Sequence, residues 1–188
     1  MDQRQEETAA SLLNTLSFQA IAAILRDYGE EPRATAIAKA IVRERARRPL
    51  QSTGQLVDLV HRVHSKRGKI NPATRVFQAL RIAVNHELEN LMKFLSDAYL
   101  WLRPGGVLAV VSFHSLEHRI IKREFQKWGK DCICPAAALE CRCGWSRKTE
   151  PLFRKPLKPS ADEMIRNPRS RSAQLRAVRR VGKPMEDS

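Results

Sequence analysis

The stretch that most constrains the fold runs from Gly105 to Phe125, GGVLAVVSFHSLEHRIIKREF. Its glycine pair allows a tight turn, and the β-branched run Val107–Val111 is typical of a strand that is covered on both faces. A polar elbow, SFHS, follows, and the apolar spacing from Leu116 to about Trp128 predicts a helix with Ser115 as its cap. Because a turn, a strand, an elbow and a helix in this order are typical of doubly wound sheets, the sequence predicts an α/β protein.

The elbow is also the first candidate site. In doubly wound sheets, ligands bind at the carboxyl ends of the strands, and this places Ser112 and His114 at the working edge. Ordinary loop polarity and a helix cap are the alternative explanation, and they would account for Ser115. Glu117 and His118 lie in the first helical turn, where we expect a structural role because a carboxylate there favours the helix dipole.

The first third of the chain predicts a small helical bundle, because its apolar residues recur at helical spacing. The expected segments are a stripe from Leu12 to Leu25 that ends near Gly29, a helix around Ile37–Val42 that Pro32 opens, and a helix after Ser52, which has the S-x-x-Q spacing of a capping box.

The remaining segments alternate between helix and strand patterns. They are a helix that Asn71 and Pro72 open and that continues to Trp101 with a bend near Asn85, a short edge strand in LFRKPLKPS, a brief helix over Ala161–Arg166 and a last strand over Ala173–Val181.

Two elements of a methyl-donor or nucleotide site are missing from these residues. Such a site needs the backbone to approach its ligand, usually through G-x-G spacing after a first strand, and none of the 8 glycines has that spacing. A [D/N/S]-P-P-[Y/F] loop, which would accept hydrogen bonds from an exocyclic amine, is missing as well. We therefore expect no complete cofactor domain here, and we assign no catalytic or cofactor-binding residue.

All 4 cysteines fall in one short segment with the pattern C-x-C-x₆-C-x-C. They are Cys132, Cys134, Cys141 and Cys143. Four thiolates can close a tetrahedral structural zinc site, although C-x-C is less typical than C-x-x-C because a single intervening residue strains the chelate. Local disulfides and free thiols are the alternatives. No open coordination position is indicated, so we do not expect a catalytic zinc.

The chain is strongly basic, with a formal net charge of +14. Such an excess favours a polyanionic partner, because neutralised phosphates release counterions, although a solvated cationic surface is the alternative. The cations gather in RERARRP, KRGK and NPRSRSAQLRAVRR, where the turn at Asn167-Pro168 would project Arg169 and Arg171 toward phosphates. No apolar run approaches the ~20 residues of a membrane span, and the polar start predicts no signal peptide, so we expect a cytoplasmic protein without membrane contact.

Five long stretches are similar to one known family. They are MDQRQEETAASLLN, INPATRVFQALRIAVNHELENL, LRPGGVLAVVSFHSLEHRIIKREF, CICPAAALECRCG and KPLKPSADEMIRNPRSRSAQLRAVRRV. In this order they resemble the small-subunit ribosomal RNA cytosine-N4 methyltransferases, the RsmH (MraW) family. The resemblance implies a partial class I, Rossmann-like methyltransferase sheet with an N-terminal helical insertion bundle. Residues 1–70 would be the insertion domain, and residues 71–188 the C-terminal part of the methyltransferase core, with a cysteine-rich loop at 130–150.

The resemblance also implies a function. It is S-adenosylmethionine-dependent methylation of the N4 amine of a cytosine in the decoding region of 16S rRNA, with 16S rRNA or the small ribosomal subunit as partner. In the family, the donor-binding half precedes the segment that resembles Met1 onward, so we expect the chain alone to be inactive and to self-associate through an exposed sheet edge. Position and residue type select the candidate RNA or target-base contacts, which are Arg81, Asn85, Ser112, His114, Arg169 and Arg171.

Three interpretations stay open on the sequence. The chain is the C-terminal part of such a methyltransferase, or a non-catalytic basic RNA-binding module derived from that family, or a zinc-stabilised basic interaction protein with no methyltransferase past. Only the third predicts that zinc governs the folding of the whole chain.

Overall fold

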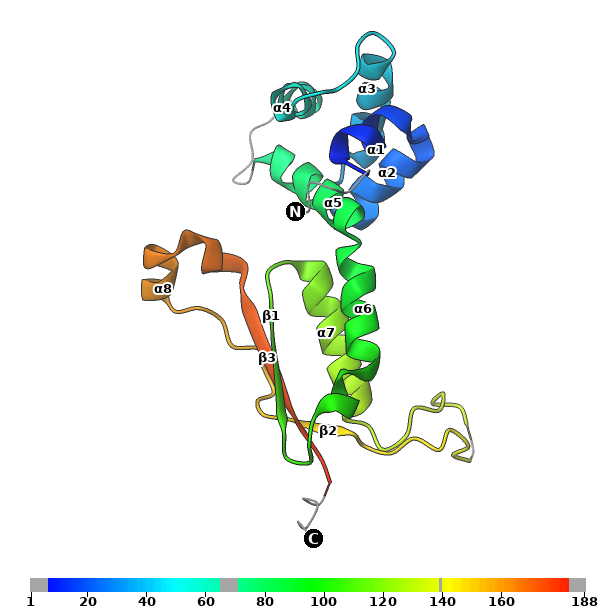
Figure 1. The fold of residues 1–188 in the computed structure, drawn as a ribbon, viewed down its shortest axis with the longest axis vertical. Coiled ribbons are helices and arrows are strands. Elements are labelled where there is room, and N and C mark those ends of the chain that lie inside the picture. Colours follow the sequence, from blue (N-terminus) through cyan, green and yellow to red (C-terminus); the bar gives the residue numbers. More distant parts are fainter. Residues whose placement is uncertain (1–6, 65–70, 139, 183–188) are drawn as a thin grey trace. The chain divides into compact units, whose positions relative to one another are not determined.

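The computed structural model describes residues 7–64, 71–138 and 140–182 (Figure 1). The chain divides into two compact units, Met1–Glu87 and Leu88–Ser188, and each is described by itself. The sequence places the boundary after residue 70, whereas α5, the helix that follows, packs with the first unit in the structure. The basic stretch KRGK lies outside the described residues.

The first unit is a helical bundle, as the apolar spacing predicts. Its helices are α1 (Ala9–Thr15), α2 (Phe18–Asp27), α3 (Ala34–Arg45), α4 (Thr53–Val63) and α5 (Pro72–Asn85). One face of each helix is buried in a shared core that includes Leu13, Ile21, Leu25, Ile37, Ile41, Leu59, Val60 and Val76. The predicted caps are confirmed at Ser52, which forms a capping box with Gln55, and at Asn71, which precedes Pro72.

Two boundaries in this unit differ from the prediction. The stripe from Leu12 to Leu25 is two helices, because Ser17 caps a new helix by accepting a hydrogen bond from the backbone of Ala20. Pro32 does not open α3, which begins at Ala34. Instead, the buried carboxylate of Glu31 accepts a hydrogen bond from the backbone N–H of Arg33 at 2.9 Å.

Gly29 follows α2, as predicted, but a close approach rather than a left-handed turn requires it. A Cβ atom at this position would lie 2.7 Å from the carbonyl oxygen of Leu25 and 2.8 Å from that of Arg75 on α5. The left-handed backbone falls on the next residue, Glu30, with φ 48°. Any side chain at Gly29 would therefore push α2 and α5 apart.

The second unit combines helices with a small sheet. Its elements are α6 (Glu87–Asp97), the 3₁₀ helix η1 (Ala98–Trp101), β1 (Val107–Ser112), α7 (Ser115–Trp128), β2 (Thr149–Pro151), α8 (Ala161–Arg166), the 3₁₀ helix η2 (Pro168–Ser172) and β3 (Gln174–Arg180). The helix expected from Asn71 to Trp101 is interrupted at His86, which has a φ of 50°, next to the predicted bend at Asn85.

The three strands are ordered β1-β3-β2 and both pairings are antiparallel. In this register Val107 lies opposite Arg179, and Ser112 lies opposite Gln174. The predicted edge strand in LFRKPLKPS is wrong, because β2 precedes it and only Leu157 forms an isolated bridge there. The prolines of that stretch lack the N–H that a longer ladder needs. The predicted mixture of helices and strands is confirmed. Since no parallel pairing occurs among the described residues, the doubly wound, Rossmann-like arrangement stays a prediction.

Helices α6 and α7, together with η1, cover one face of the sheet (Figure 1). The core between them contains Leu95 and Ala98 together with Ile121, Phe125, Trp128 and Val178, and the inward residues Leu108 and Val110 pack against it. On the opposite face of β1, Val107 is 47% exposed and Val111 is 51% exposed. The expectation that this strand is covered on both faces is therefore wrong for the part of the chain that the structure describes.

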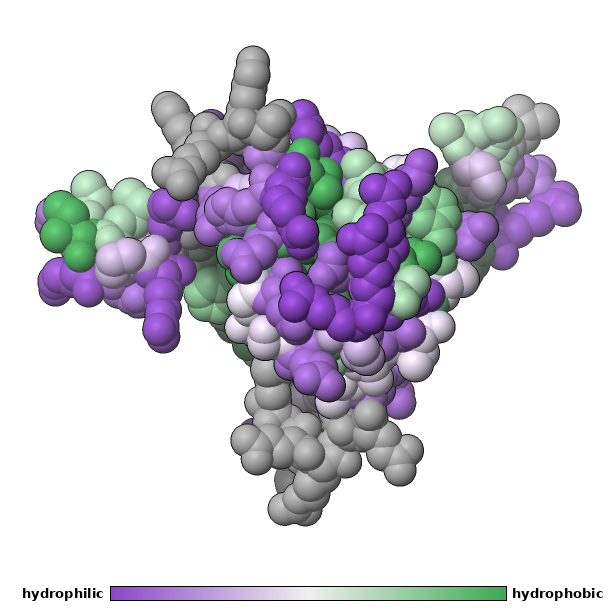
Figure 2. Space-filling model, turned by 90° about the horizontal axis from the view of Figure 1, so that it is seen from above, coloured by the Kyte–Doolittle hydropathy of each residue, from purple (hydrophilic) through white to green (hydrophobic). Residues whose placement is uncertain are grey.

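The surface is consistent with a basic, polar protein. The face seen in Figure 2 is mostly hydrophilic, and hydrophobic side chains appear on it in small separate groups. Among the described residues, no helix combines the length and the apolar character that crossing a bilayer requires.

Candidate nucleic-acid interface and cysteine cluster

Ser112 ends β1 and connects three elements of the second unit. Its Oγ donates to the carbonyl oxygen of Gln174 on β3 at 3.3 Å and lies 3.4 Å from Nδ1 of His118 on α7. The side chain is buried, with the residue 2% exposed. Ser112 therefore holds His118 in place, and it is not positioned to contact a large ligand directly.

His114, rather than Ser115, caps α7. The His114 Nδ1 accepts a hydrogen bond from the backbone N–H of Glu117 at 3.3 Å, and the Glu117 carboxylate accepts from the backbone N–H groups of Phe113 and His114. This is a capping box in which imidazole replaces the usual hydroxyl. The predicted structural role of Glu117 is confirmed, and the burial of His114 in the cap makes it a poor candidate for contact with a base.

A cationic hollow of about 760 Å³ lies beside the first turns of α7. Its lining is formed by Ser115, His118, Arg119, Lys122, Lys155, Pro156, Lys158, Gln174 and Arg176. Five of these residues are lysines or arginines, and none of them is an aspartate or a glutamate. The hollow is therefore a place where the protein concentrates positive charge without an acidic neighbour in the lining.

The electrostatics of the hollow favour an anion. Burial lowers the pKa of His118, and the positive charges of Arg176, Lys122 and Lys158 lower it further. Burial also lowers the pKa of Arg176, whose Nε is buried and has no hydrogen-bond partner among the described residues. A desolvated guanidinium without a full set of acceptors is costly, and a bound phosphate would supply both the charge and the acceptor oxygens.

The predicted contact residues fall into two groups. Ser112 and His114 lie where β1 ends, and Arg169 and Arg171 are exposed on η2, the turn that leads directly into β3. As predicted, the side chain of Asn167 fixes this turn by accepting from the backbone N–H of Arg169 at 3.3 Å. These four residues therefore belong to the end of the sheet that also carries the cationic hollow.

Arg81 and Asn85 belong to the first unit and are engaged with one carboxylate. Nε of Arg81 lies 2.9 Å from Glu87, and the side-chain amide of Asn85 donates to Glu87 at 3.1 Å. A phosphate at this position would have to compete with that carboxylate, so these two are weaker candidates than the lining of the hollow.

Sequence reasoning missed most of the hollow. Lys155 and Lys158 were expected in an edge strand, and Arg119 and Lys122 look like an ordinary solvated helix face. One signal was available: His118 and Lys122 are four positions apart on a predicted helix and therefore share a face. Nothing in the sequence shows that Arg176, 54 positions after Lys122 in the numbering, joins them.

The four cysteine sulfurs converge in the loop between α7 and β2. The Sγ of Cys132 lies 3.3 Å from that of Cys141 and 3.7 Å from that of Cys143, and the last two are 3.6 Å apart. Together with Cys134, all four sulfurs lie within 4.8 Å of one another and none is in a disulfide. Backbone N–H groups of Ile133 and Trp145 lower the pKa of Cys143 to about 6. These residues could hold a metal ion.

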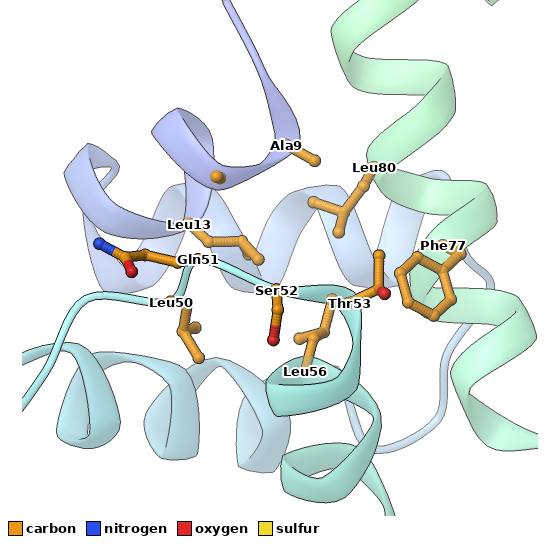
Figure 3. Close-up of a pocket in the computed structure, with 10 residues that line it drawn as sticks. Ala9, Leu13, Leu50, Gln51, Ser52, Thr53, Leu56, Phe77 and Leu80 are labelled. Atoms are coloured by element: carbon orange, nitrogen blue, oxygen red, sulfur yellow. The ribbon is translucent and has the colours of Figure 1, made fainter.

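A further hollow in the first unit is small and uncharged. It has a volume of about 110 Å³ and lies between α1, α4, α5 and the segment before α4, with Leu13, Leu56, Phe77 and Leu80 among its lining residues (Figure 3). None of the residues that line it is titratable. We interpret it as a gap in the packing of the bundle and not as a site for a charged ligand.

Comparison with known proteins gives one consistent result. Residues 1–181 match the model of the MraW methylase family. Ribosomal RNA small subunit methyltransferase H of Thermomicrobium roseum is 52% identical over 181 residues, which cover 96% of this chain and 56% of that protein. The proteins of the same name from Symbiobacterium thermophilum and Syntrophobacter fumaroxidans are 49% and 48% identical, and 57% and 59% of their lengths are covered.

This chain thus spans less than three fifths of the length of these relatives, while nearly all of its own residues are matched. The match contains both units, the elbow after β1, the cysteine loop and β3. A basic interaction protein unrelated to methyltransferases is therefore ruled out, and the chain belongs to the MraW methylase family.

Proposed function

We propose that these residues form the RNA-holding part of an S-adenosylmethionine-dependent methyltransferase that modifies the N4 amine of a cytosine in the decoding region of 16S rRNA. Family membership and the names of the relatives support the reaction and the substrate class. The observation that carries the proposal is the cationic hollow at the end of β1, with five cations and no carboxylate in its lining. A cytoplasmic location follows from this substrate and is part of the same proposal.

The hollow suits the sugar-phosphate backbone better than a base. Lysine and arginine contacts to phosphates hold a nucleic acid in register, and they carry most of the salt-dependent affinity. The exposed Arg169 and Arg171 would extend this surface toward η2. Ser112 and His118 would act as positioning residues, because their mutual contact orients the imidazole at the rim of the hollow.

The chemistry needs an unstacked cytosine and precise alignment. The N4 nitrogen is a weak nucleophile, because its lone pair is delocalised into the ring. S-adenosylmethionine would supply an electrophilic methyl group, and residues that hold the RNA would align N4 with it while an acceptor takes the N4 proton. The base must leave its stack to reach the donor. These residues contain no G-x-G loop. We therefore assign the binding site for the methyl donor to the part of the family proteins that this chain does not match.

A non-catalytic RNA-binding module is the second candidate, and the same missing G-x-G loop favours it. The coding DNA upstream of Met1 separates the two, because an in-frame glycine-rich stretch there supports the enzyme.

Both candidates predict that the 188-residue chain alone does not bind S-adenosylmethionine. Calorimetry that shows micromolar binding would contradict the assignment of the donor site. The predicted self-association through the uncovered face and edge of β1 is tested by sedimentation.

RNA binding tests the hollow itself. We would titrate a labelled hairpin of the decoding region with the chain and with Lys122→Ala, Lys158→Ala and Arg176→Ala. Each variant should weaken binding about 3- to 10-fold and lower the slope of log K against log salt by about one, as expected for a lost phosphate contact. Lys93→Ala is the matched control, because it removes the same charge from an exposed position on α6. An equal loss in the control would reduce the hollow to a non-specific cationic surface.

A further inference from the structure

Two side-chain contacts join the ends of the loop from Lys130 to Lys148, here named the cysteine loop. The indole Nε1 of Trp145 donates to the carbonyl oxygen of Lys130 at 3.1 Å, and Arg147 pairs with Asp131 at 2.8 Å. These contacts bring the two ends of the loop together. They do not explain the convergence farther along the loop, where the four cysteines lie.

Beyond these two contacts, the loop lacks the usual sources of order. Its described residues form no helix or strand, and nearly all of them are exposed or only half-buried. Ile133, its large aliphatic residue in the described part, is itself 38% exposed. Hydrophobic burial therefore cannot be what gathers four polar sulfurs from two separate C-x-C pairs within 4.8 Å of one another.

The sulfur positions of Cys132, Cys141 and Cys143 match one face of a tetrahedral metal site. Zinc–thiolate bonds of about 2.3 Å give sulfur–sulfur edges of about 3.8 Å in a regular tetrahedron. The separations of 3.3, 3.6 and 3.7 Å lie at or slightly below that edge, and the sulfur of Cys134 lies within 4.8 Å of the other three. We propose that Cys132, Cys134, Cys141 and Cys143 bind one Zn²⁺ in a closed structural site. This inference does not depend on the proposed function.

Other sulfur chemistry fits less well. A disulfide would bring one pair to about 2.05 Å, well below any separation seen here. An iron–sulfur cluster would attach the cysteines to several iron atoms and spread their sulfurs over a wider volume. Among single ions, Zn²⁺ suits four thiolates and a closed tetrahedron without redox chemistry. On binding, each sulfur forms a bond to zinc as a thiolate, and every cysteine that is still protonated releases its proton to solvent as the ion enters.

Four thiolates and one Zn²⁺ carry a net charge of −2. The loop contains both cations and carboxylates, and Arg142 pairs with Glu140 at 3.5 Å. Lys127 and Lys148 lie over the ring of Trp145, at 5.6 Å and 5.2 Å from its centroid. The backbone N–H of Cys134 points to the sulfur of Cys132 at 3.3 Å. Such N–H···S contacts stabilise thiolate ligands.

The metal content of the full chain tests the proposal directly. The protein would be purified under reducing conditions, supplied with zinc sulfate and desalted. We expect one zinc per chain by mass spectrometry of the metal. All 4 cysteines of the sequence belong to the site, so a thiol titration counts the site alone. A mercurial reagent should release one zinc as four thiols react, and Co²⁺ in place of zinc should give the intense visible bands of a tetrahedral thiolate complex.

Variants and proteolysis separate binding from folding. Cys143→Ser and Cys132→Ser should each weaken zinc retention at least tenfold against a competing chelator, whereas Ser146→Ala, in the same loop, should retain it. Helix content by circular dichroism should be equal in all of them, because neither hydrophobic core includes a cysteine. Trypsin should cut after Arg142 much faster once zinc is chelated, since this residue lies between two of the ligands.

Several results would overturn the assignment. Four freely reactive thiols with no retained zinc would show that the cluster does not bind the ion. The protein could also contain two disulfides when it is purified without reductant and fail to load zinc after reduction. That result would show that the cysteines form disulfides instead of a metal site. Stoichiometric iron in preference to zinc would overturn the choice of metal.

Discussion

Several arginines of the first unit lie beside carboxylates, whereas the lining of the cationic hollow in the second unit contains no carboxylate. Arg48 pairs with Glu44 at 3.0 Å and Arg81 with Glu87 at 2.9 Å. In the hollow, the cationic neighbours of His118 add to burial in lowering its pKa. Both units contribute to a net charge of +14, so the total does not distinguish them. Cations held close together at one site repel one another, and such a cluster indicates an anionic ligand better than the net charge of the whole chain does.

The two units also differ in what orders them. The first is a bundle of helices, most of them capped by side chains, around an apolar core. The second contains a small sheet covered on one face and a cysteine loop with almost no buried apolar side chain. A metal site is therefore expected in the second unit, because its cysteine loop buries little apolar surface and part of that loop's order has to come from what it binds.

The largest test of this contrast reverses charges in each unit. Lys122→Glu with Arg176→Glu should weaken binding of a decoding-region RNA by about 100-fold, because two phosphate contacts become repulsive. Arg48→Glu with Arg62→Glu changes the same charge in the first unit, where both arginines face Glu44. That variant should weaken binding less than about threefold in a filter or fluorescence assay, since long-range charge alone is screened by salt. Equal losses would remove the distinction between the units.

A packing variant tests the bundle alone. Gly29→Ala should lower the free energy of unfolding by about 1–3 kcal/mol, because its Cβ has no room between α2 and α5. Gly54→Ala is the control: its Cβ meets only Ser52 Oγ at 3.9 Å, so it should be neutral or stabilising by up to about 1 kcal/mol. Urea denaturation measures both. The cationic hollow belongs to the other unit, so zinc and RNA binding of folded Gly29→Ala should be unchanged.

The smallest expected effect is the pH dependence from His118. Its pKa is lowered in the folded protein, so the unfolded chain takes up this proton first as the pH falls below its ordinary value of about 6.5. The stability linked to His118 is thus fully present above that pH. It is lost as the pH falls from there to the lower pKa of His118 in the folded protein. The effect should stay below about 1 kcal/mol, because solvent screens a half-exposed group.

Denaturation at pH 7.5 and 5.5 measures this term. The loss of stability between the two should shrink in His118→Gln, because this variant removes the titrating imidazole. A pH dependence that is identical in wild type and His118→Gln would show that the cations around the hollow do not act on this imidazole.

Local signals in the sequence predicted most of the elements and the cysteine cluster, although they missed β2 and the break between α1 and α2. Helical spacing, the S-x-x-Q box at Ser52 and the Asn71-Pro72 start depend on residues within one or two turns, so they can be recognised without the fold. The strand at Val107 and the pattern of C-x-C pairs were recognised in the same way. The cap of α7 was misassigned to Ser115, because imidazole is an uncommon capping group and its acceptor nitrogen became visible only in the structure.

By itself, the sequence determined the family, the basic character and the positions of most helices, since these follow from composition and short-range spacing. Only the tertiary structure decided that β3 lies between β1 and β2, that one face of β1 is uncovered, and that Lys155, Lys158 and Arg176 meet α7 at one hollow. The reason is that strand pairing and charge clustering join residues that are distant along the chain, and no local pattern records which of many cations will become neighbours.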